Sequence, residues 1–131
     1  MTNILFFLLP KGQVEYLFGD FSLRQAMEKM EYHRYSVVPV VSRDGKYLYS
    51  LSEGDILYAL KNNKYSFDEL NKIPLSSINR KRNFSSVSIN ASMDDLASLI
   101  VNQNFVPVVD DKGIFIGIVT RKSVINYLLE K

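Results

Sequence analysis

The chain has 131 residues, of which 47% are hydrophobic and 23% charged, and its formal net charge is +2. This length suits one compact domain, and the balanced composition excludes a disordered or low-complexity protein. The absence of cysteine and the presence of one histidine exclude disulfides, cysteine-ligated metals and multi-histidine metal sites. The net charge is too small to indicate a nucleic-acid partner.

An apolar run at residues 4–9 is the first feature along the chain. It is much shorter than the roughly 20 residues that a membrane-spanning helix needs. It also lacks the basic region and the cleavage site of a signal peptide. The run therefore predicts a buried strand or a docked N-terminal arm, with no membrane partner, and the cytoplasm is the expected compartment.

An internal repeat organises the rest of the sequence. Pro39 and the two valines after it recur 68 residues later as Pro107 and two valines. The same offset places Gly45 on Gly113 without a gap. Each half of the chain therefore carries one copy of the same structural unit.

The first copy predicts the order β-α-β-β-α from its periodicity, caps and turn residues. The predicted elements are a short strand at 14–17, a helix capped by Ser22, a strand at 35–41, a turn at 42–45, a strand at 46–51 and a helix capped by Ser52. The predicted inward residues are Leu23, Ala26, Met27 and Met30 on the first helix and Ile56, Leu57 and Leu60 on the second.

The second copy predicts the same order. Its elements are a short strand at 86–89, a helix from the Ser92 cap to Asn102, a strand at 105–109, a turn at 110–113, a strand at 114–119 and a helix capped by Thr120. The predicted inward residues of its first helix are Leu96, Leu99 and Ile100, and its last helix carries the apolar residues Val124, Ile125, Leu128 and Leu129. Between the copies, Ser66 and Glu69 form a predicted capping box that opens a short helix, and Pro74 ends it.

The fold class that follows is α/β (α+β), with repeat 1 at 1–62, a linker with a short helix at 63–83 and repeat 2 at 84–131. Each repeat is marginal alone, because so few residues bury little surface. We therefore expect the two β-α-β-β-α repeats to pack sheet to sheet with pseudo-twofold symmetry. Residues 1–131 would then form a single module.

Both copies contain segments that resemble a known family. In the first copy the resemblance lies in Val-Val-Pro-Val-Val at 37–41, Asp-Gly at 44–45 and Ser-Glu-Gly-Asp at 52–55. In the second it lies in residues 105–110, Gly113 and residues 117–121. These segments are similar to the core of a CBS domain, and two such domains in tandem resemble a Bateman module. The resemblance covers residues 14–129.

The resemblance implies a regulatory function. CBS pairs bind adenosine-containing ligands in clefts between the repeats: AMP, ADP, ATP, S-adenosylmethionine and cyclic dinucleotides such as cyclic di-AMP. They often assemble through their helices into a flat homodimer. With no enzyme or transporter attached, this chain is expected to act in trans on an unknown regulated protein. No cofactor is required, and the adenine nucleotide is the regulatory ligand.

Asp55 is the strongest candidate for a ligand-binding residue. It matches the aspartate of the family's Ser/Thr-x-x-Asp motif, which implies that its carboxylate accepts hydrogen bonds from ribose hydroxyls. Ser52 opens that motif and could donate its hydroxyl to a phosphate or a ribose. The alternative is that Ser52 and Asp55 are an ordinary capping pair at a helix start.

The second copy departs from the family at the matching place. Thr120 aligns with the motif's hydroxyl, but Ser123 stands where the aspartate would be. Arg121 could instead face phosphates, whereas Lys122 is expected to be a solvated residue at the helix start. The two clefts are therefore predicted to be unequal, with the Asp55 cleft the better nucleoside site.

The remaining candidate residues form apolar walls suited to a flat purine. They are Tyr35, Ser36, Val37, Val38 and Pro39 in the first copy, Phe105, Val106 and Pro107 in the second, and Val14, Tyr16 and Val87 on the short strands. Arg34 stands where the family often has glycine. The basic cluster at 80–82 lies either at a cleft mouth or in a solvated loop.

Two other function classes are alternatives to the sensor. An enzyme is disfavoured, because the sequence has no glycine-rich phosphate loop, no metal-ligand cluster and no nucleophile–base pair. A structural protein-interaction module with degenerate, empty clefts remains the alternative, since Arg34 and Ser123 depart from the family pattern.

Overall fold

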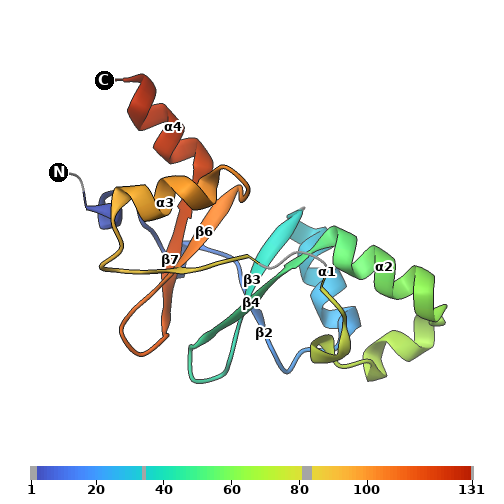
Figure 1. The fold of residues 1–131 in the computed structure, drawn as a ribbon. Coiled ribbons are helices and arrows are strands. Elements are labelled where there is room, and N and C mark those ends of the chain that lie inside the picture. Colours follow the sequence, from blue (N-terminus) through green and yellow to red (C-terminus); the bar gives the residue numbers. More distant parts are fainter. Residues whose placement is uncertain (1–2, 34, 81–83, 131) are drawn as a thin grey trace. The chain divides into compact units, whose positions relative to one another are not determined.

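The computed structural model describes residues 3–33, 35–80 and 84–130, and Figure 1 shows its fold. The chain forms two compact units. The first-repeat unit consists of Tyr16–Arg43 and Leu48–Asn83. The second-repeat unit consists of the described residues up to Glu15, of Asp44–Tyr47, and of those from Phe84 onward.

The first-repeat unit has a three-stranded sheet beside two helices (Figure 1). Its elements are β2 (Leu17–Phe18), α1 (Leu23–His33), β3 (Val37–Val41), β4 (Tyr47–Ser52) and α2 (Glu53–Asn63), followed by the 3₁₀ helices η3 (Phe67–Lys72) and η4 (Leu75–Ser77). The strand order is β2-β3-β4, and β2 runs parallel to β3. This is the predicted β-α-β-β-α order.

The second-repeat unit repeats that order and adds the N-terminal arm. Its elements are η1 (Ile4–Phe7), β1 (Leu9–Pro10), η2 (Lys11–Gln13), β5 (Val87–Ser88), α3 (Met93–Ile100), β6 (Phe105–Val109), β7 (Phe115–Thr120) and α4 (Arg121–Leu129). The strand order is β1-β7-β6-β5, with β1 antiparallel to β7 and β5 parallel to β6. The mixed α/β fold class is confirmed, and the sheet-to-sheet packing of the repeats stays a prediction.

Each unit buries its own apolar core, because its helices and strands turn branched side chains toward one another. Leu23, Val40 and Leu51 are fully buried in the first-repeat unit. Leu96 and Val106 are fully buried in the second-repeat unit. The predicted inward faces of α1 and α3 are therefore confirmed, with Leu23, Ala26 and Met30 buried on α1 and Leu96 and Ile100 buried on α3.

The predicted helix starts are present as capping boxes. At α1 the Ser22 hydroxyl accepts from the backbone N–H of Gln25, whose side chain accepts from the Ser22 N–H. The backbone N–H of Ser66 donates to the Glu69 carboxylate (3.0 Å) at the start of η3. These reciprocal bonds satisfy backbone donors that a helix start would otherwise leave unpaired. The predicted short helix in the linker is thus a 3₁₀ helix.

Several element boundaries differ from the sequence prediction. The short strand of the first copy comprises Leu17–Phe18 and not 14–17, because Leu17 and Phe18 are the residues that pair with β3. Helix α3 ends at Ile100, two residues before the predicted Asn102. The apolar run at residues 4–9 is a docked arm, in which Ile4 and Phe7 are buried.

Leu57, which was predicted to face inward on α2, is exposed, and so are three apolar residues of α4. Leu57 is 65% exposed, Ile125 43%, Leu128 56% and Leu129 78%. On α4 the core contact is made by Val124. The helical period rotates Ile125 and Leu129 away from Val124, whereas Leu128 lies on the same side as Val124, one turn nearer the end of the helix. Apolar character alone did not reveal which side of each helix meets the sheet.

None of the helices in the described ranges is both long and apolar enough to cross a membrane.

Gly117 is required where β1 approaches β7. It pairs with Pro10, and a Cβ at this position would overlap the carbonyl oxygen of Leu9. We predict that Gly117→Ala lowers the free energy of unfolding by about 1–3 kcal/mol, the range for forced overpacking. Urea denaturation of Gly12→Ala provides the control, because a Cβ at Gly12 meets nothing within 4 Å. Equal stability of the two variants would contradict this role.

Candidate functional site

A strand–helix junction carries the predicted site of the first repeat. Strand β4 ends at Ser52, which caps α2, and the backbone N–H of Glu53 donates to the carbonyl oxygen of Ser36 (2.8 Å). This bond holds the start of α2 beside the segment that leads into β3. The structure therefore brings together the candidates Ser36, Ser52 and Asp55.

Asp55 and Ser52 form a complete capping box. The Ser52 hydroxyl accepts from the backbone N–H of Asp55 (3.1 Å), and Asp55 Oδ2 accepts from the backbone N–H of Ser52 (3.1 Å). Asp55 is only 3% exposed. The carboxylate proposed from the sequence for ribose binding thus has a structural role at the helix start, where a negative charge is also favoured by the helix dipole.

The other first-repeat candidates differ in accessibility. Tyr35 is 41% exposed, and its ring is stacked on His33 with 5.5 Å between centroids. Val38 and Pro39 are buried in β3, whereas Val37 is half-buried. Tyr16 precedes β2, where its carbonyl oxygen accepts from the Lys29 ammonium (2.9 Å). Tyr35 and Ser36 are thus the exposed members of the predicted wall.

The second repeat contains the same junction. The backbone N–H of Arg121 donates to the carbonyl oxygen of Asn104 (2.9 Å), at positions that match Glu53 and Ser36. Thr120 Oγ1 accepts from the backbone N–H of Ser123 (3.2 Å), as Ser52 does from Asp55. Two hydrogen bonds of the first junction are therefore repeated at the second.

The Ser123 and Arg121 side chains are engaged locally. The Ser123 hydroxyl donates to the Thr120 carbonyl oxygen (2.9 Å), so no carboxylate is available at this junction for a ribose. The Arg121 Nε donates to the carbonyl oxygen of Ile100 (2.6 Å), and its Nη2 reaches that of Val101 at 3.4 Å. Arg121 therefore caps the C-terminus of α3, and its predicted phosphate contact stays a prediction.

The apolar candidates of the second repeat lie mainly in the core. Phe105, Val106, Pro107 and Val87 are buried, and Val14 is half-buried. A residue missed by the sequence reasoning, Gln103, fixes the approach to β6. Its amide is buried, accepts from the Ser85 N–H (2.8 Å) and donates to the carbonyl oxygens of Ser85 and Phe105. No motif in the sequence indicates that Gln103 is buried or that it bonds these backbone groups.

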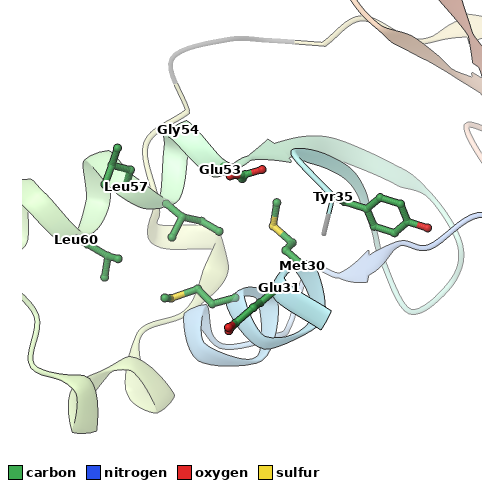
Figure 2. A pocket seen from close by; sticks show the side chains of 9 residues that line it. Met30, Glu31, Tyr35, Glu53, Gly54, Leu57 and Leu60 are labelled. Atoms are coloured by element: carbon green, nitrogen blue, oxygen red, sulfur yellow. The ribbon is translucent and has the colours of Figure 1, made fainter. Parts of the chain in front are cut away.

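An open groove lies between α1 and α2 in the first-repeat unit, with a volume of about 660 Å³ (Figure 2). Most of its apolar residues were predicted to be core, and no sequence signal indicated that the carboxylates of Glu31 and Glu53 line a groove. Its lining residues are Met27, Met30, Glu31, Tyr35, Glu53, Gly54, Ile56, Leu57 and Leu60. A smaller hollow of about 460 Å³ lies at the start of α4, lined by Asn104, Thr120, Arg121, Lys122, Ile125 and Asn126.

Of the basic cluster at 80–82, Arg80 lies within the described residues. The Arg80 guanidinium lies 3.7 Å from the centre of the Tyr49 ring, a cation–π contact, and burial raises the pKa of the Tyr49 hydroxyl. Arg34, Lys81 and Arg82 lie outside the described residues. Within the described part of the chain, no cluster of three metal-ligating side chains is found.

The sequence profile of the CBS domain matches this chain twice, over residues 9–62 and 75–130. The chain belongs to the CBS domain family. Both matched segments include a strand–helix junction, so the two junctions are the corresponding parts of two CBS domains. No curated protein matches the chain.

Solved structures of other CBS proteins share this fold. CbpB of Streptococcus agalactiae is 26% identical, with a TM-score of 0.82 over 95% of this chain and 80% of that one. CbpB of Listeria monocytogenes, solved in complex with c-di-AMP, is 22% identical, with a TM-score of 0.87 over 98% and 96%. CBSX2 in complex with AMP is 21% identical, with a TM-score of 0.76 over 99% and 98%.

The capping role of Arg121 predicts a loss of stability without any ligand. Arg121→Met removes the donors to the α3 carbonyls and should lower the free energy of unfolding by about 1 kcal/mol. Lys122→Met, one residue on and exposed, should change it by less than about 0.5 kcal/mol. Chemical denaturation of the two variants without ligand measures both values. A neutral Arg121→Met would show that the cap contributes nothing.

Proposed function

We propose that this CBS protein is a regulatory module that binds an adenosine-containing ligand and acts in trans on a partner protein, with no chemistry of its own. The observation that carries the proposal is the pair of matched strand–helix junctions. Each joins a helix start to a strand by one backbone bond, Glu53 to Ser36 and Arg121 to Asn104. The family membership and the nucleotide complexes of CbpB and CBSX2 support the same ligand class.

The chemistry of the first junction suits a nucleoside. Ser52 Oγ accepts a bond from the backbone but does not use its own proton in it, so the hydroxyl can donate to a ribose or a phosphate. Asp55 offers a carboxylate, whose two oxygens can accept from the two hydroxyls of a ribose. Exposed Tyr35 offers an aromatic face for a purine.

The two junctions are proposed to bind with unequal affinity. The first contains the Asp55 carboxylate, whereas the second contains Ser123, whose hydroxyl already donates to the Thr120 carbonyl. Hydrogen bonds to a charged group are roughly twice as strong as those between neutral groups. The ligand therefore occupies the first junction at the lower concentration.

One specific observation favours a second candidate function. Asp55 is buried in its capping box and Arg121 caps α3, so both residues have structural roles that need no ligand. A protein-interaction module without a nucleotide would use the same contacts. Ligand binding itself decides between the two candidates.

Self-association forms part of the proposal. Leu57 on α2 and Leu128 and Leu129 on α4 are large apolar side chains that each expose more than half of their surface. Burial of such side chains is a main source of association energy. A homodimer formed through the helices would cover them. The regulated partner and the cytoplasmic location stay predictions.

A thermal-shift panel tests ligand binding. We expect cyclic di-AMP or an adenine nucleotide to raise the melting temperature, because a ligand that binds only the folded state stabilises it by mass action. At one hundred times its Kd the gain is about 2.7 kcal/mol. The panel comprises cyclic di-AMP, AMP, ADP, ATP and S-adenosylmethionine, with GMP as a control for the base. No shift with any adenosine compound would favour the interaction module.

A matched pair of variants separates the two roles of Asp55. Asp55→Asn should weaken binding of the best ligand by about tenfold or more, because a charge-assisted bond is lost. Asp95→Asn is the control: Asp95 makes the same capping box with Ser92 at α3 and is not a proposed ligand residue. Isothermal titration gives Kd for both, and denaturation shows whether they lose similar stability. Equal Kd values would limit Asp55 to its structural role.

A further inference from the structure

Three aromatic rings lie against one another at the end of α1. Tyr32 meets the His33 ring edge to face, with 4.9 Å between centroids and 82° between planes. His33 is stacked on Tyr35, with 5.5 Å between centroids and 15° between planes. Both separations lie in the range that favourable aromatic pairs adopt. Tyr32, His33 and Tyr35 therefore form one aromatic cluster, with His33 between the two tyrosines.

The backbone around Tyr35 is fixed on both sides. Its own N–H donates to the carbonyl oxygen of Met30 (3.2 Å), which closes the last turn of α1. The carbonyl oxygen of the next residue, Ser36, accepts from the backbone N–H of Glu53 (2.8 Å) at the start of α2. These two bonds place Tyr35 beside the first strand–helix junction, but they leave its side-chain torsions free to change rotamer.

The stack on His33 restricts the remaining freedom of the Tyr35 ring. One face of that ring lies against the imidazole, so the surface that stays exposed, 41% of the residue, belongs mainly to the other face and the ring edge. Figure 2 shows the ring at the opposite end of the groove from Leu60. Among the described residues, no hydrogen bond holds the Tyr35 hydroxyl. The orientation of the ring therefore depends on His33.

The second repeat has no aromatic residue in the corresponding turn. Gln103 stands where the first repeat has Tyr35, directly before Asn104, which accepts the backbone bond from the start of α4. The Gln103 amide is buried and is bonded to the backbone of Ser85 and Phe105. Residues 100–103 contain no aromatic ring. An exposed ring held by a second ring is thus a property of the first repeat.

We propose that His33 is a positioning residue, which holds the Tyr35 ring in the orientation that stacks on the base of the ligand. The base lies on the face of Tyr35 opposite His33, so Tyr35 is held between two flat rings. Such stacking acts on the base alone, because ribose and phosphate have no aromatic face. The inference rests on the proposed function and adds the residue that orders its base-binding surface.

The expected effect follows from when the ring is ordered. A side chain that becomes ordered only on binding lowers affinity, because its freedom is lost at that moment. With His33 in place, this loss occurs when the protein folds. Removal of the His33 ring should therefore weaken binding about two- to tenfold. Removal of the Tyr35 ring should weaken it about fivefold or more, since the stacking surface itself is lost.

The single histidine of the chain gives a readout that needs no ligand. Its imidazole proton signals are unique in an NMR spectrum, and the ring currents of the neighbouring tyrosines shift them. Tyr35→Leu should move these signals toward the positions they have in the unfolded chain. Phe67→Leu, which removes another exposed ring on η3, is the control and should leave them in place. Signals that Tyr35→Leu does not move would overturn the stack.

Binding measurements test the positioning role. His33→Leu removes the ring, whereas His33→Phe keeps a flat ring in the same place. Kd is measured for AMP, cyclic di-AMP and ribose 5-phosphate, a probe without a base, by isothermal titration or by displacement. We expect His33→Leu to weaken the adenine compounds and to leave ribose 5-phosphate unchanged. His33→Phe should restore the adenine compounds, and Phe67→Leu should change none of the three.

The contrary outcomes separate this inference from the proposed function. Unchanged Kd values for the adenine compounds in His33→Leu would overturn the role of His33 and leave the sensor in place. Equal losses for the adenine compounds and ribose 5-phosphate, without rescue by His33→Phe, would limit His33 to a structural role and overturn the inference as well. A protein that binds neither AMP nor cyclic di-AMP would overturn both the sensor and the inference.

Discussion

The arrangement of each repeat depends on one backbone hydrogen bond between the first residue of a helix and the segment leading into a strand. Glu53 donates to Ser36 and Arg121 to Asn104. A helix start has unpaired N–H groups that must find acceptors. In the first repeat, the N–H of Glu53 joins α2 to the segment before β3, and the N–H of Asp55 is satisfied by the Ser52 hydroxyl. The positions of the candidate residues follow from this shared use of donors.

The residues that stabilise these helix starts are also candidate ligand residues, so a substitution there affects both stability and binding. Asp55 holds its own helix start and is also the carboxylate that we propose for ribose binding. Arg121 is a cation near a candidate site and already binds the end of α3. A ligand that bound Asp55 or Arg121 would either replace the hydrogen bond that the residue makes within the protein or add a further one. Binding would thus be coupled to the order of the helix starts.

Much of the fold was predictable because the chain repeats itself. The matching segments at Pro39 and Pro107 predicted the positions of two strands. Ser22 and Ser52 predicted the starts of two helices, because a serine cap is a local signal. The exposure of three apolar residues of α4 was not predictable, since Leu128 is as apolar as a core residue and only tertiary contact decides its side. Nor did composition indicate that Asp55 would be buried, because burial depends on how the junction closes.

The N-terminal arm has a consequence for how this protein folds. Strand β1 forms an edge of the sheet on β7, more than one hundred residues further along the chain. During synthesis the arm therefore emerges long before its partner strand exists. Its apolar side chains must wait in solution or in transient contacts until the last repeat is complete. Docking of this arm onto β7 closes a loop of more than one hundred residues.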